Sequence, residues 1–152
     1  MTVLNISELM KIIEKHRKEG KKIVTTNGCF DILHVGHIHS FETAKKQGDI
    51  LIVGVNSDRS VKAYKGPSRP VNSQHERAKM VASLKPVDYV IIFDEDTPNE
   101  LLDKIKTDVH VKSKTGYTGV EEKTVIKHGG RVFLVEDIPN KSTTNIINKM
   151  KK

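Results

Sequence analysis

The sequence has almost no cysteine and no long apolar run. Its one cysteine, Cys29, excludes a disulfide within the chain and is typical of proteins from a reducing compartment. No apolar run approaches the roughly 20 residues that a membrane-spanning helix requires. The N-terminal segment MTVLNISELMKIIEKHRKEG carries acids and lacks the continuous apolar core and small-residue cleavage site of a signal peptide. We therefore expect a cytoplasmic location and no membrane contact.

The chain is also poor in aromatic residues, which make up 5% of it, and it contains no tryptophan. This is a thin supply for a surface that stacks nucleic-acid bases. Lysine and arginine nevertheless outnumber Asp and Glu by 26 to 19, giving a formal net charge of +7. That charge fits a solvated lysine-rich surface, and it also fits a site that handles phosphates or nucleic acid. Charge alone does not separate these readings, but the sparse aromatics argue against a nucleic-acid partner.

Short apolar runs alternate with segments of helical periodicity along the 152 residues. The runs are continuous, as in strands whose two faces are both covered, and they predict one three-layer α/β domain with a five-stranded parallel sheet. Strands are expected near residues 21–27, 49–58, 87–93, 108–112 and 131–135. Helices are expected near residues 6–19 (with Ser7 as N-cap), 38–47, 74–85, 94–106, 120–130 and 142–152, and residues 60–73 read as a loop.

Polar residues gather where the expected strands end. Four polar segments, 27–37, 56–58, 112–117 and 141–144, follow four of the strands. Ligands of parallel sheets bind beyond the carboxyl ends of the strands. The convergence of these segments predicts a binding site at that edge of the sheet.

His34 and His37, with Gly36 between them, come at the start of a helix after the first strand. At this spacing both imidazoles share one face of the first turn. Free backbone N–H groups and the positive end of the helix dipole favour phosphate there, and Gly36 lets a ligand approach the backbone closely. No cysteine or third histidine has metal-ligand spacing, so no metal site is expected. The remaining alternative is two ordinary residues at a helix start.

Two further groups of residues are candidates for phosphate contacts. Ser142 to Thr144 open the last expected helix, where an N-cap and a phosphate site can be combined. Lys65 and Arg69 lie in the expected 60–73 loop and either reach phosphates or remain exposed. Arg77 is a stronger candidate because its guanidinium can bridge phosphate oxygens, with a surface ion pair as the alternative.

The segment TNGCFDILHVGH (residues 26–37) resembles the HxGH signature of the nucleotidyltransferase superfamily that includes the cytidylyltransferases. It is followed in order by GDILIVGVNSD, KGPSRPVNSQHER, VDYVIIFDEDTP and STTNII. Together these segments are similar to the adenylyltransferase domain of heptose 1-phosphate adenylyltransferases. The resemblance implies a Rossmann-like nucleotidyltransferase fold. It places one domain over residues 1–152, with an N-terminal helix in 1–20 and a catalytic core in 22–150.

In that family, an oxygen of a sugar phosphate attacks the α-phosphorus of a nucleoside triphosphate, and pyrophosphate leaves. The protein must hold two anions in line and neutralise charge. The resemblance implies that the two histidines hold the triphosphate and steady the transition state. We expect catalytic roles for His34, His37, Lys65 and Arg77. The expected nucleotide-binding residues are Asn27, Gly28, Phe30, Asp31, His34, Gly36, His37, Ser142, Thr143 and Thr144.

The loop after the fourth strand departs from the heptose enzymes, in which it usually reads Lys-Gly-Gly-Asp-Tyr. Here it is VKSKTGY, in which Lys112 and Tyr117 fit the pattern. Lys114 stands near the position of the acid and favours a more anionic acceptor, so the identity of the sugar stays open. The expected substrate-binding residues are Asn56, Asp58, Arg69, Lys112, Lys114 and Tyr117.

The expected activity is the transfer of AMP from ATP, carried with Mg²⁺, to a sugar 1-phosphate, most simply a heptose. The alternatives are a glycerol-phosphate or other alditol-phosphate cytidylyltransferase, an FAD-synthetase-like adenylyltransferase, and a non-catalytic nucleotide- or RNA-binding module. The resemblance also implies a homodimer, formed through the N-terminal helix or the PVDYVIIF strand, and a separate kinase that supplies the sugar 1-phosphate.

Overall fold

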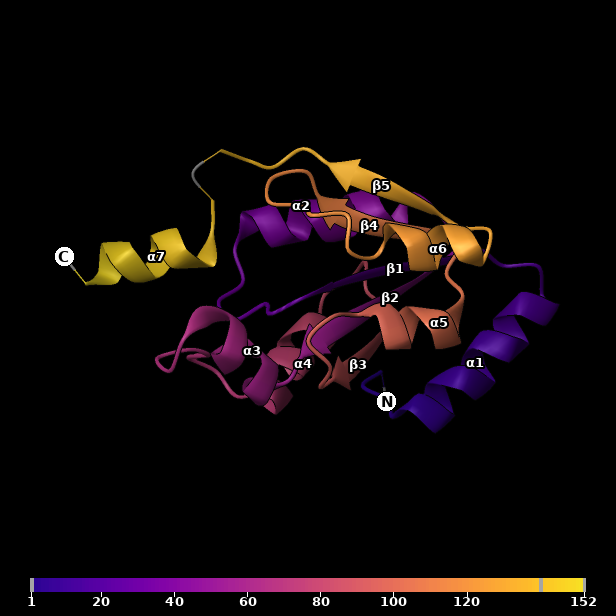
Figure 1. The fold of residues 1–152 in the computed structure, drawn as a ribbon, viewed down its shortest axis with the longest axis horizontal. Helices are drawn as coiled ribbons and strands as arrows, with labels where there is room; N and C mark the ends of the chain where they lie inside the picture. Colours follow the sequence, from indigo (N-terminus) through magenta and orange to yellow (C-terminus); the bar gives the residue numbers. More distant parts are fainter. Residues whose placement is uncertain (1, 140, 152) are drawn as a thin grey trace.

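The computed structural model describes residues 2–139 and 141–151 (Figure 1). The strands are β1 (Ile23–Gly28), β2 (Ile50–Asn56), β3 (Tyr89–Phe93), β4 (Val109–Ser113) and β5 (Arg131–Val135). The helices are α1 (Ile6–Lys18), α2 (Val35–Lys45), α3 (Asp58–Lys65), α4 (Gln74–Ala82), α5 (Asn99–Ile105), α6 (Glu122–Lys127) and α7 (Thr143–Met150). Within these residues, no helix combines the length and the apolar character needed to cross a membrane.

The five strands form one parallel sheet in the order β3-β2-β1-β4-β5, which confirms the expected sheet. The first strand, β1, lies in the centre of the sheet. β2 and β3 follow on one side of it, and β4 lies on its other side. The strand order therefore reverses between β1 and β4. The crevice at the carboxyl ends of these two strands is where such sheets bind ligands, and Asn27 and Lys112 lie at those ends.

Helices cover both faces of the sheet, which confirms the three layers (Figure 1). On one face, buried side chains of α2 and α4, such as Phe41 and Val81, pack on the valines of the strands. On the other face, α1 and α5 bury Leu9 and Ile105 against isoleucines of the strands. Because both faces are covered, the strands need apolar residues at successive positions, and this is why they appear as continuous apolar runs.

The cap of α1 and the structure of residues 58–65 differ from those expected. Asn5 rather than Ser7 caps α1, because Asn5 accepts the N–H of Glu8 while the Glu8 carboxylate accepts the N–H of Asn5. Most of the expected loop before residue 66 is helical, and it forms α3. Ser57 caps this helix and Val61 is buried beneath it, whereas the prolines that suggested a loop come after the helix has ended.

The outer edge of β3 is partly covered by the segment before α1. Val3 forms a parallel bridge with Val90. The N–H of Leu4 donates to the carbonyl of Val90 (2.9 Å), and the N–H of Val90 donates to the carbonyl of Thr2 (2.8 Å). A second copy of the chain that paired with β3 at Val90 would first have to displace this segment.

A row of buried polar side chains lies under β1 and β4. The Thr25 hydroxyl donates to Thr107 Oγ1 (3.0 Å), and the Thr107 hydroxyl donates to the carbonyl of Val109 (2.9 Å). Both hydroxyl protons are then used. The 2.8 Å contact between His110 Nδ1 and Thr25 Oγ1 therefore needs a proton from the imidazole. His110 is accordingly protonated at Nδ1, and its Nε2 is an acceptor.

We expect acid to destabilise the fold partly through His110. Burial, followed by the charge of Lys112, lowers the pKa of His110 to about 3 from an ordinary value of 6.5. Below pH 6.5 the unfolded chain gains a proton that the folded chain does not, so stability is full above this pH and declines toward pH 3. Between about pH 7.5 and about pH 5, urea unfolding should show a loss of about 2 kcal/mol that a His110→Asn variant lacks. Equal losses in the two proteins would contradict a neutral, buried His110.

Candidate active site

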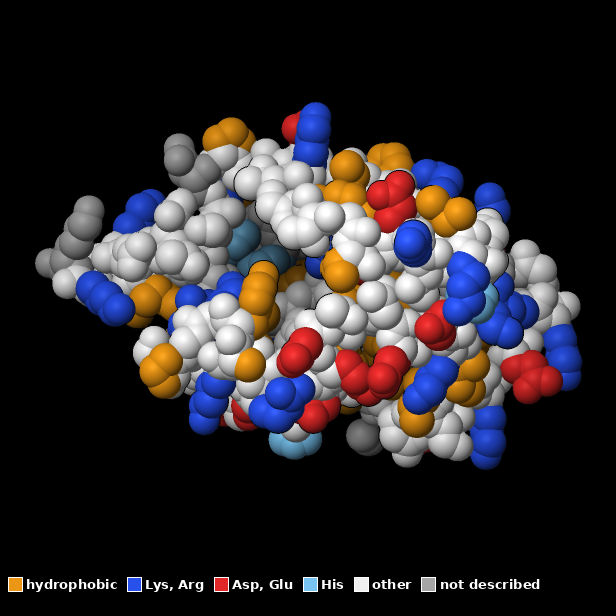
Figure 2. Space-filling view, in the orientation of Figure 1, with side chains coloured by type: hydrophobic (Ala, Val, Ile, Leu, Met, Phe, Trp, Pro, Cys, Tyr) orange, Lys and Arg blue, Asp and Glu red, His pale blue; other side chains and the backbone are white. Residues whose placement is uncertain are grey.

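Two cavities adjoin at the carboxyl ends of the strands. The first, which we call the His37 cavity, has a volume of about 200 Å³. The second, the Glu121 cavity, has a volume of about 500 Å³. Lys65, Lys112 and the segment 27–29 line both of them. Figure 2 shows histidine side chains inside a hollow that lies between α3 and α7.

His34 caps α2, which begins earlier than the expected start at residue 38. His34 Nδ1 accepts the N–H of Gly36 (3.1 Å), and His37 Nδ1 accepts the N–H of His34 (3.2 Å). The two rings stack with their centroids 3.9 Å apart. A neutral imidazole whose Nδ1 accepts a hydrogen bond carries its proton on Nε2. Each ring therefore offers an Nε2–H donor at the start of a helix, where the dipole also favours an anion.

The histidine pair is neutral at neutral pH. Burial lowers the pKa of His37 to about 4, with smaller contributions from the charges of His34 and Lys65. Burial, and then the charge of Lys141, also lower the pKa of His34. Protonation would place a second proton on Nδ1 and break its contact with a backbone N–H. The rings are thus suited to donate hydrogen bonds rather than to act as cations.

Aromatic rings shape the wall of the His37 cavity. Phe30 lines it, and its ring centroid lies 5.4 Å from that of His37. A Cβ atom on Gly28 would lie 2.9 Å from the Phe30 ring, and one on Gly36 would lie 2.8 Å from the His34 ring. The ring of His34 thus covers Gly36, which corrects the expectation that Gly36 is open to a ligand. Both glycines are needed because rings pack directly on the backbone.

One of the three expected hydroxyls of the last helix reaches the site. Thr143 lines the His37 cavity, and its Oγ1 donates to the carbonyl of Ile32 (2.8 Å). Ser142 is the N-cap of α7, as expected, and accepts the N–H of Asn145 (3.0 Å). Thr144 is exposed. The rest of α7 extends away from the sheet (Figure 1).

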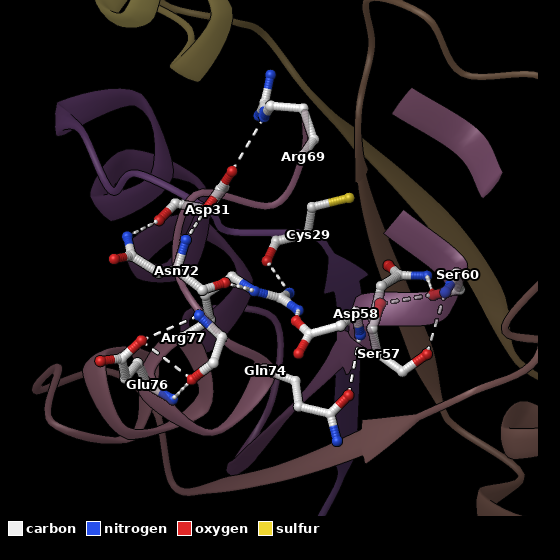
Figure 3. Close-up of polar contacts among 12 residues, drawn as sticks. Cys29, Asp31, Ser57, Asp58, Ser60, Arg69, Asn72, Gln74, Glu76 and Arg77 are labelled. Carbon is white, nitrogen blue, oxygen red and sulfur yellow. Dashed lines mark hydrogen bonds and ion pairs between the residues drawn. The ribbon is translucent and has the colours of Figure 1, made fainter. Parts of the chain in front are cut away.

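Arg77 binds protein groups rather than facing a cavity (Figure 3). Its Nε donates to the carbonyl of Asn72 (3.0 Å), its Nη1 to the carbonyl of Cys29 (2.7 Å) and its Nη2 to Asp58 Oδ1 (2.9 Å). Its side chain is fully buried. This geometry corrects the expected catalytic role of Arg77, whereas the partly exposed Asp58 keeps its expected substrate contact as a prediction. Together the two side chains hold three segments of the chain in place.

Asp31 is bound in a similar way (Figure 3). Its carboxylate accepts the N–H groups of Val71 (2.8 Å) and Asn72 (2.9 Å) and the Nε–H of Arg69 (3.0 Å). Burial alone would raise the pKa of Asp31, but these donors outweigh it and lower the pKa. Asp31 lines the His37 cavity, yet its carboxylate anchors the loop before α4 to the loop after β1. Arg69 Nη2 is buried without a partner in the described residues, so its substrate contact stays a prediction.

Lys65 and Lys112 are the cations that lie between the two cavities. Lys65 is the last residue of α3 and not part of a loop, which corrects its expected setting. Lys112 Nζ donates to the carbonyl of Asn27 (3.1 Å) and to Asn27 Oδ1 (3.3 Å). Burial lowers the pKa of Lys112, and the charge of Glu121 opposes this shift. Both side chains therefore border each cavity.

The Glu121 cavity contains two more of the expected acceptor residues, Asn56 and Tyr117. Lys114 is not among them. It is exposed and pairs with Glu136 (2.9 Å), so its contact with an acceptor stays a prediction. Sequence reasoning missed Glu121, which is 3% exposed and lines this cavity. It stood in an expected helix where an acid is ordinarily solvated, and only its burial sets it apart.

No group of three His, Cys, Asp or Glu side chains within residues 2–139 and 141–151 is placed to hold a metal ion. The groups that converge are the neutral imidazoles at the start of α2 and the ammonium groups of the two lysines. Such a set suits the binding of phosphates. It has no nucleophile with an adjacent base, so it fits direct transfer between two bound phosphates.

Comparison with known proteins agrees with this geometry. A family model described as cytidylyltransferase-like matches residues 25–151. The chain belongs to the cytidylyltransferase-like family. Among structures of similar fold is one titled as the lipopolysaccharide core biosynthesis protein from Thermoplasma volcanium GSS1. It has a TM-score of 0.66 and 29% sequence identity, and the match covers 78% of this chain and 98% of that one.

Curated relatives of this cytidylyltransferase-like chain carry the name bifunctional protein HldE. The protein from Campylobacter fetus is 51% identical over 150 residues, which cover 98% of this chain and 31% of the relative. The protein from Geobacter metallireducens is 50% identical over 151 residues, with 97% and 31% covered. The chain thus spans about a third of the length of these relatives.

The proton positions of the histidine pair can be measured directly. We expect ¹⁵N NMR at neutral pH to show His34 and His37 protonated at Nε2, because each Nδ1 accepts a backbone N–H. On acidification, His37 should stay neutral until about pH 4. A His37 that titrates near the ordinary value of about 6.5, or that carries its proton on Nδ1, would contradict the described geometry.

Replacing Arg77 by methionine should unfold the protein more easily. The carbonyls of Cys29 and Asn72 and the carboxylate of Asp58 would lose their donors, which should cost about 3 kcal/mol in urea unfolding. The control is Arg59→Met, which removes an exposed pair with Asp94 and should cost less than about 1 kcal/mol. Wild-type stability of the Arg77→Met protein with a loss of nucleotide binding would instead restore the role first expected.

Proposed function

We propose that this chain transfers AMP from ATP to a sugar 1-phosphate, with release of pyrophosphate and formation of an ADP-sugar. The observation that carries the proposal is that the two cavities meet at Lys65 and Lys112. The His37 cavity offers neutral donors at a helix start to a triphosphate. The Glu121 cavity has room for a sugar phosphate. The lysines stand between the two, where negative charge builds during the transfer.

The reaction asks the protein for positioning rather than for covalent chemistry. An oxygen of the acceptor phosphate attacks the α-phosphorus of ATP, the bond to the bridging oxygen breaks, and pyrophosphate leaves. Mg²⁺ enters as part of the ATP complex and offsets phosphate charge. His34 and His37 donate hydrogen bonds to phosphate oxygens through Nε2–H. Lys65 and Lys112 hold the two anions in line.

Heptose is the sugar that we propose. Five segments in order resemble heptose 1-phosphate adenylyltransferases, and they extend from residue 26 to residue 147. The relatives named bifunctional protein HldE are similar to the chain over nearly its whole length. The similar crystal structure carries a title that refers to lipopolysaccharide core biosynthesis. Because the relatives are about three times as long, the proposal concerns only the activity of the shared region.

A second candidate is the transfer of CMP from CTP to glycerol phosphate or another alditol phosphate, and the family description favours it. The +7 charge favours a third candidate, a nucleotide- or RNA-binding module without catalysis. We further propose a cytoplasmic homodimer. The segment on the β3 edge makes the exposed face of α1 a better interface than a sheet continued through Val90. Light scattering in solution measures the mass that tests it.

The proposed reaction can be followed by pyrophosphate release. Wild-type protein is incubated with ATP or CTP, Mg²⁺, and a panel of heptose, hexose and alditol phosphates. We expect turnover to be fastest with ATP and heptose 1-phosphate. His34→Ala and His37→Ala should each lower kcat on the order of 10²-fold, as for lost transition-state donors. His39→Ala, a change at an exposed position of the same helix, should stay near wild type.

Three outcomes would decide against the proposal. Turnover only with CTP and an alditol phosphate would favour the second candidate. No pyrophosphate with any pair, together with tight RNA binding that weakens steeply with salt, would favour the binding module. Normal turnover of either histidine variant would remove that residue from the mechanism.

A further inference from the structure

Buried polar atoms without partners gather on one side of the Glu121 cavity. Glu121 is 3% exposed, and its Oε2 has no hydrogen-bond partner among the residues described. The hydroxyl of Tyr117, which lines the same cavity, is also buried with no partner in that part of the chain. A buried carboxylate that lacks donors is strongly destabilising, and folded proteins satisfy nearly all such groups. These two therefore call for an explanation.

His110 adds a second acceptor near Glu121. The hydroxyls of Thr25 and Thr107 fix the His110 proton on Nδ1, so Nε2 is bare. Nε2 lies 4.0 Å from Glu121 Oε1, which is too long for a hydrogen bond, and it has no partner in the described chain. Two facing acceptors cannot satisfy one another. This side of the cavity is therefore short of donors.

Two cations, Lys65 and Lys112, line the same cavity, and both also line the His37 cavity. A phosphate group is attracted to these lysines and repelled by the Glu121 carboxylate. A hydroxyl group has the reverse preference, since it donates a proton to a carboxylate or an imidazole nitrogen. The cavity thus offers cations to a phosphate and a carboxylate acceptor to hydroxyl donors.

We propose that Glu121, assisted by Tyr117, binds hydroxyl groups of the acceptor and thereby selects a polyhydroxylated phosphate ester over a simpler one. This inference rests on the proposed function, and it adds a specificity residue and an orientation to it. The phosphate of the acceptor points to Lys65 and Lys112, and its polyol part points to Glu121. Burial, followed by the charge of Glu121, raises the pKa of Tyr117, so its hydroxyl keeps its proton and can also donate.

The test compares Glu121→Gln with Glu122→Gln, an exposed neighbour on α6 that serves as the matched control. Heptose 1-phosphate and glycerol 3-phosphate are the two acceptors, each with ATP and Mg²⁺. For Glu121→Gln we expect the KM for heptose 1-phosphate to rise about 10- to 100-fold, as for a lost charged hydrogen bond. The KM for ATP and the KM for glycerol 3-phosphate should change less than about twofold. The control should match wild type throughout.

Thermal unfolding separates recognition from a structural role. Removing an unsatisfied buried charge should leave the Tm of Glu121→Gln equal to or above that of wild type. If Glu121→Gln does not fold, Tyr117→Phe, which deletes only a hydroxyl, takes its place. That variant should raise the KM for heptose 1-phosphate about fivefold without changing the KM for ATP.

The two proposals fail in different ways. Wild-type turnover with an unchanged heptose 1-phosphate KM in Glu121→Gln would overturn the role of Glu121 and leave the proposed function standing. If wild type shows no turnover, calorimetric titration with heptose 1-phosphate tests the cavity alone. Binding that Glu121→Gln weakens would support the polyol site without catalysis, and no binding to wild type would overturn it.

Discussion

The buried guanidinium of Arg77 is the contact on which the candidate site depends. It joins the loop after β1, the start of α3 and the loop before α4, which are segments far apart in the chain. Asp31 has the opposite charge, and its buried carboxylate accepts hydrogen bonds from backbone N–H groups of the loop before α4. Each charge is stabilised because its hydrogen-bonding groups are satisfied by the protein. Together they fix the walls of both cavities, and they leave the two lysines to meet a ligand.

The architecture was predictable from the sequence because the same pattern, an apolar run followed by a helical segment, recurs along the chain. Covered strands demand apolar runs, and five of them in alternation with helices allow few other folds. The positions of His34 and His37 were also predictable, since strand, loop and helix start follow one another locally. The partners of Arg77, Asp58 and Lys114 were not predictable, because the sequence around a charged residue does not indicate which distant group it will contact. Glu121 was missed for a related reason, since burial of an acid depends on what packs around it.

The two cavities differ in the charge of the groups that line them. Under the proposed function, neutral donors and ammonium groups surround the place where phosphates would meet, and the acceptor Glu121 lines only the Glu121 cavity. A symmetric set of cations would bind two anions equally well in either cavity. The acceptors break that symmetry, because a triphosphate placed against Glu121 would be repelled. Under the proposed function, this arrangement would keep the two substrates apart by electrostatics as well as by shape.

Under the proposed function, the histidine pair performs two tasks with different nitrogens of the same rings. Nδ1 of each ring accepts a backbone N–H at the start of α2, and this contact supports the helix whether or not a phosphate is present. Nε2 is the nitrogen left for a ligand. Selection for folding alone would consequently retain both histidines in a relative that had lost its activity. The HxGH motif in a sequence is thus stronger evidence for the fold than for activity. The residues at positions 65, 112 and 121 are better indicators of an active homologue.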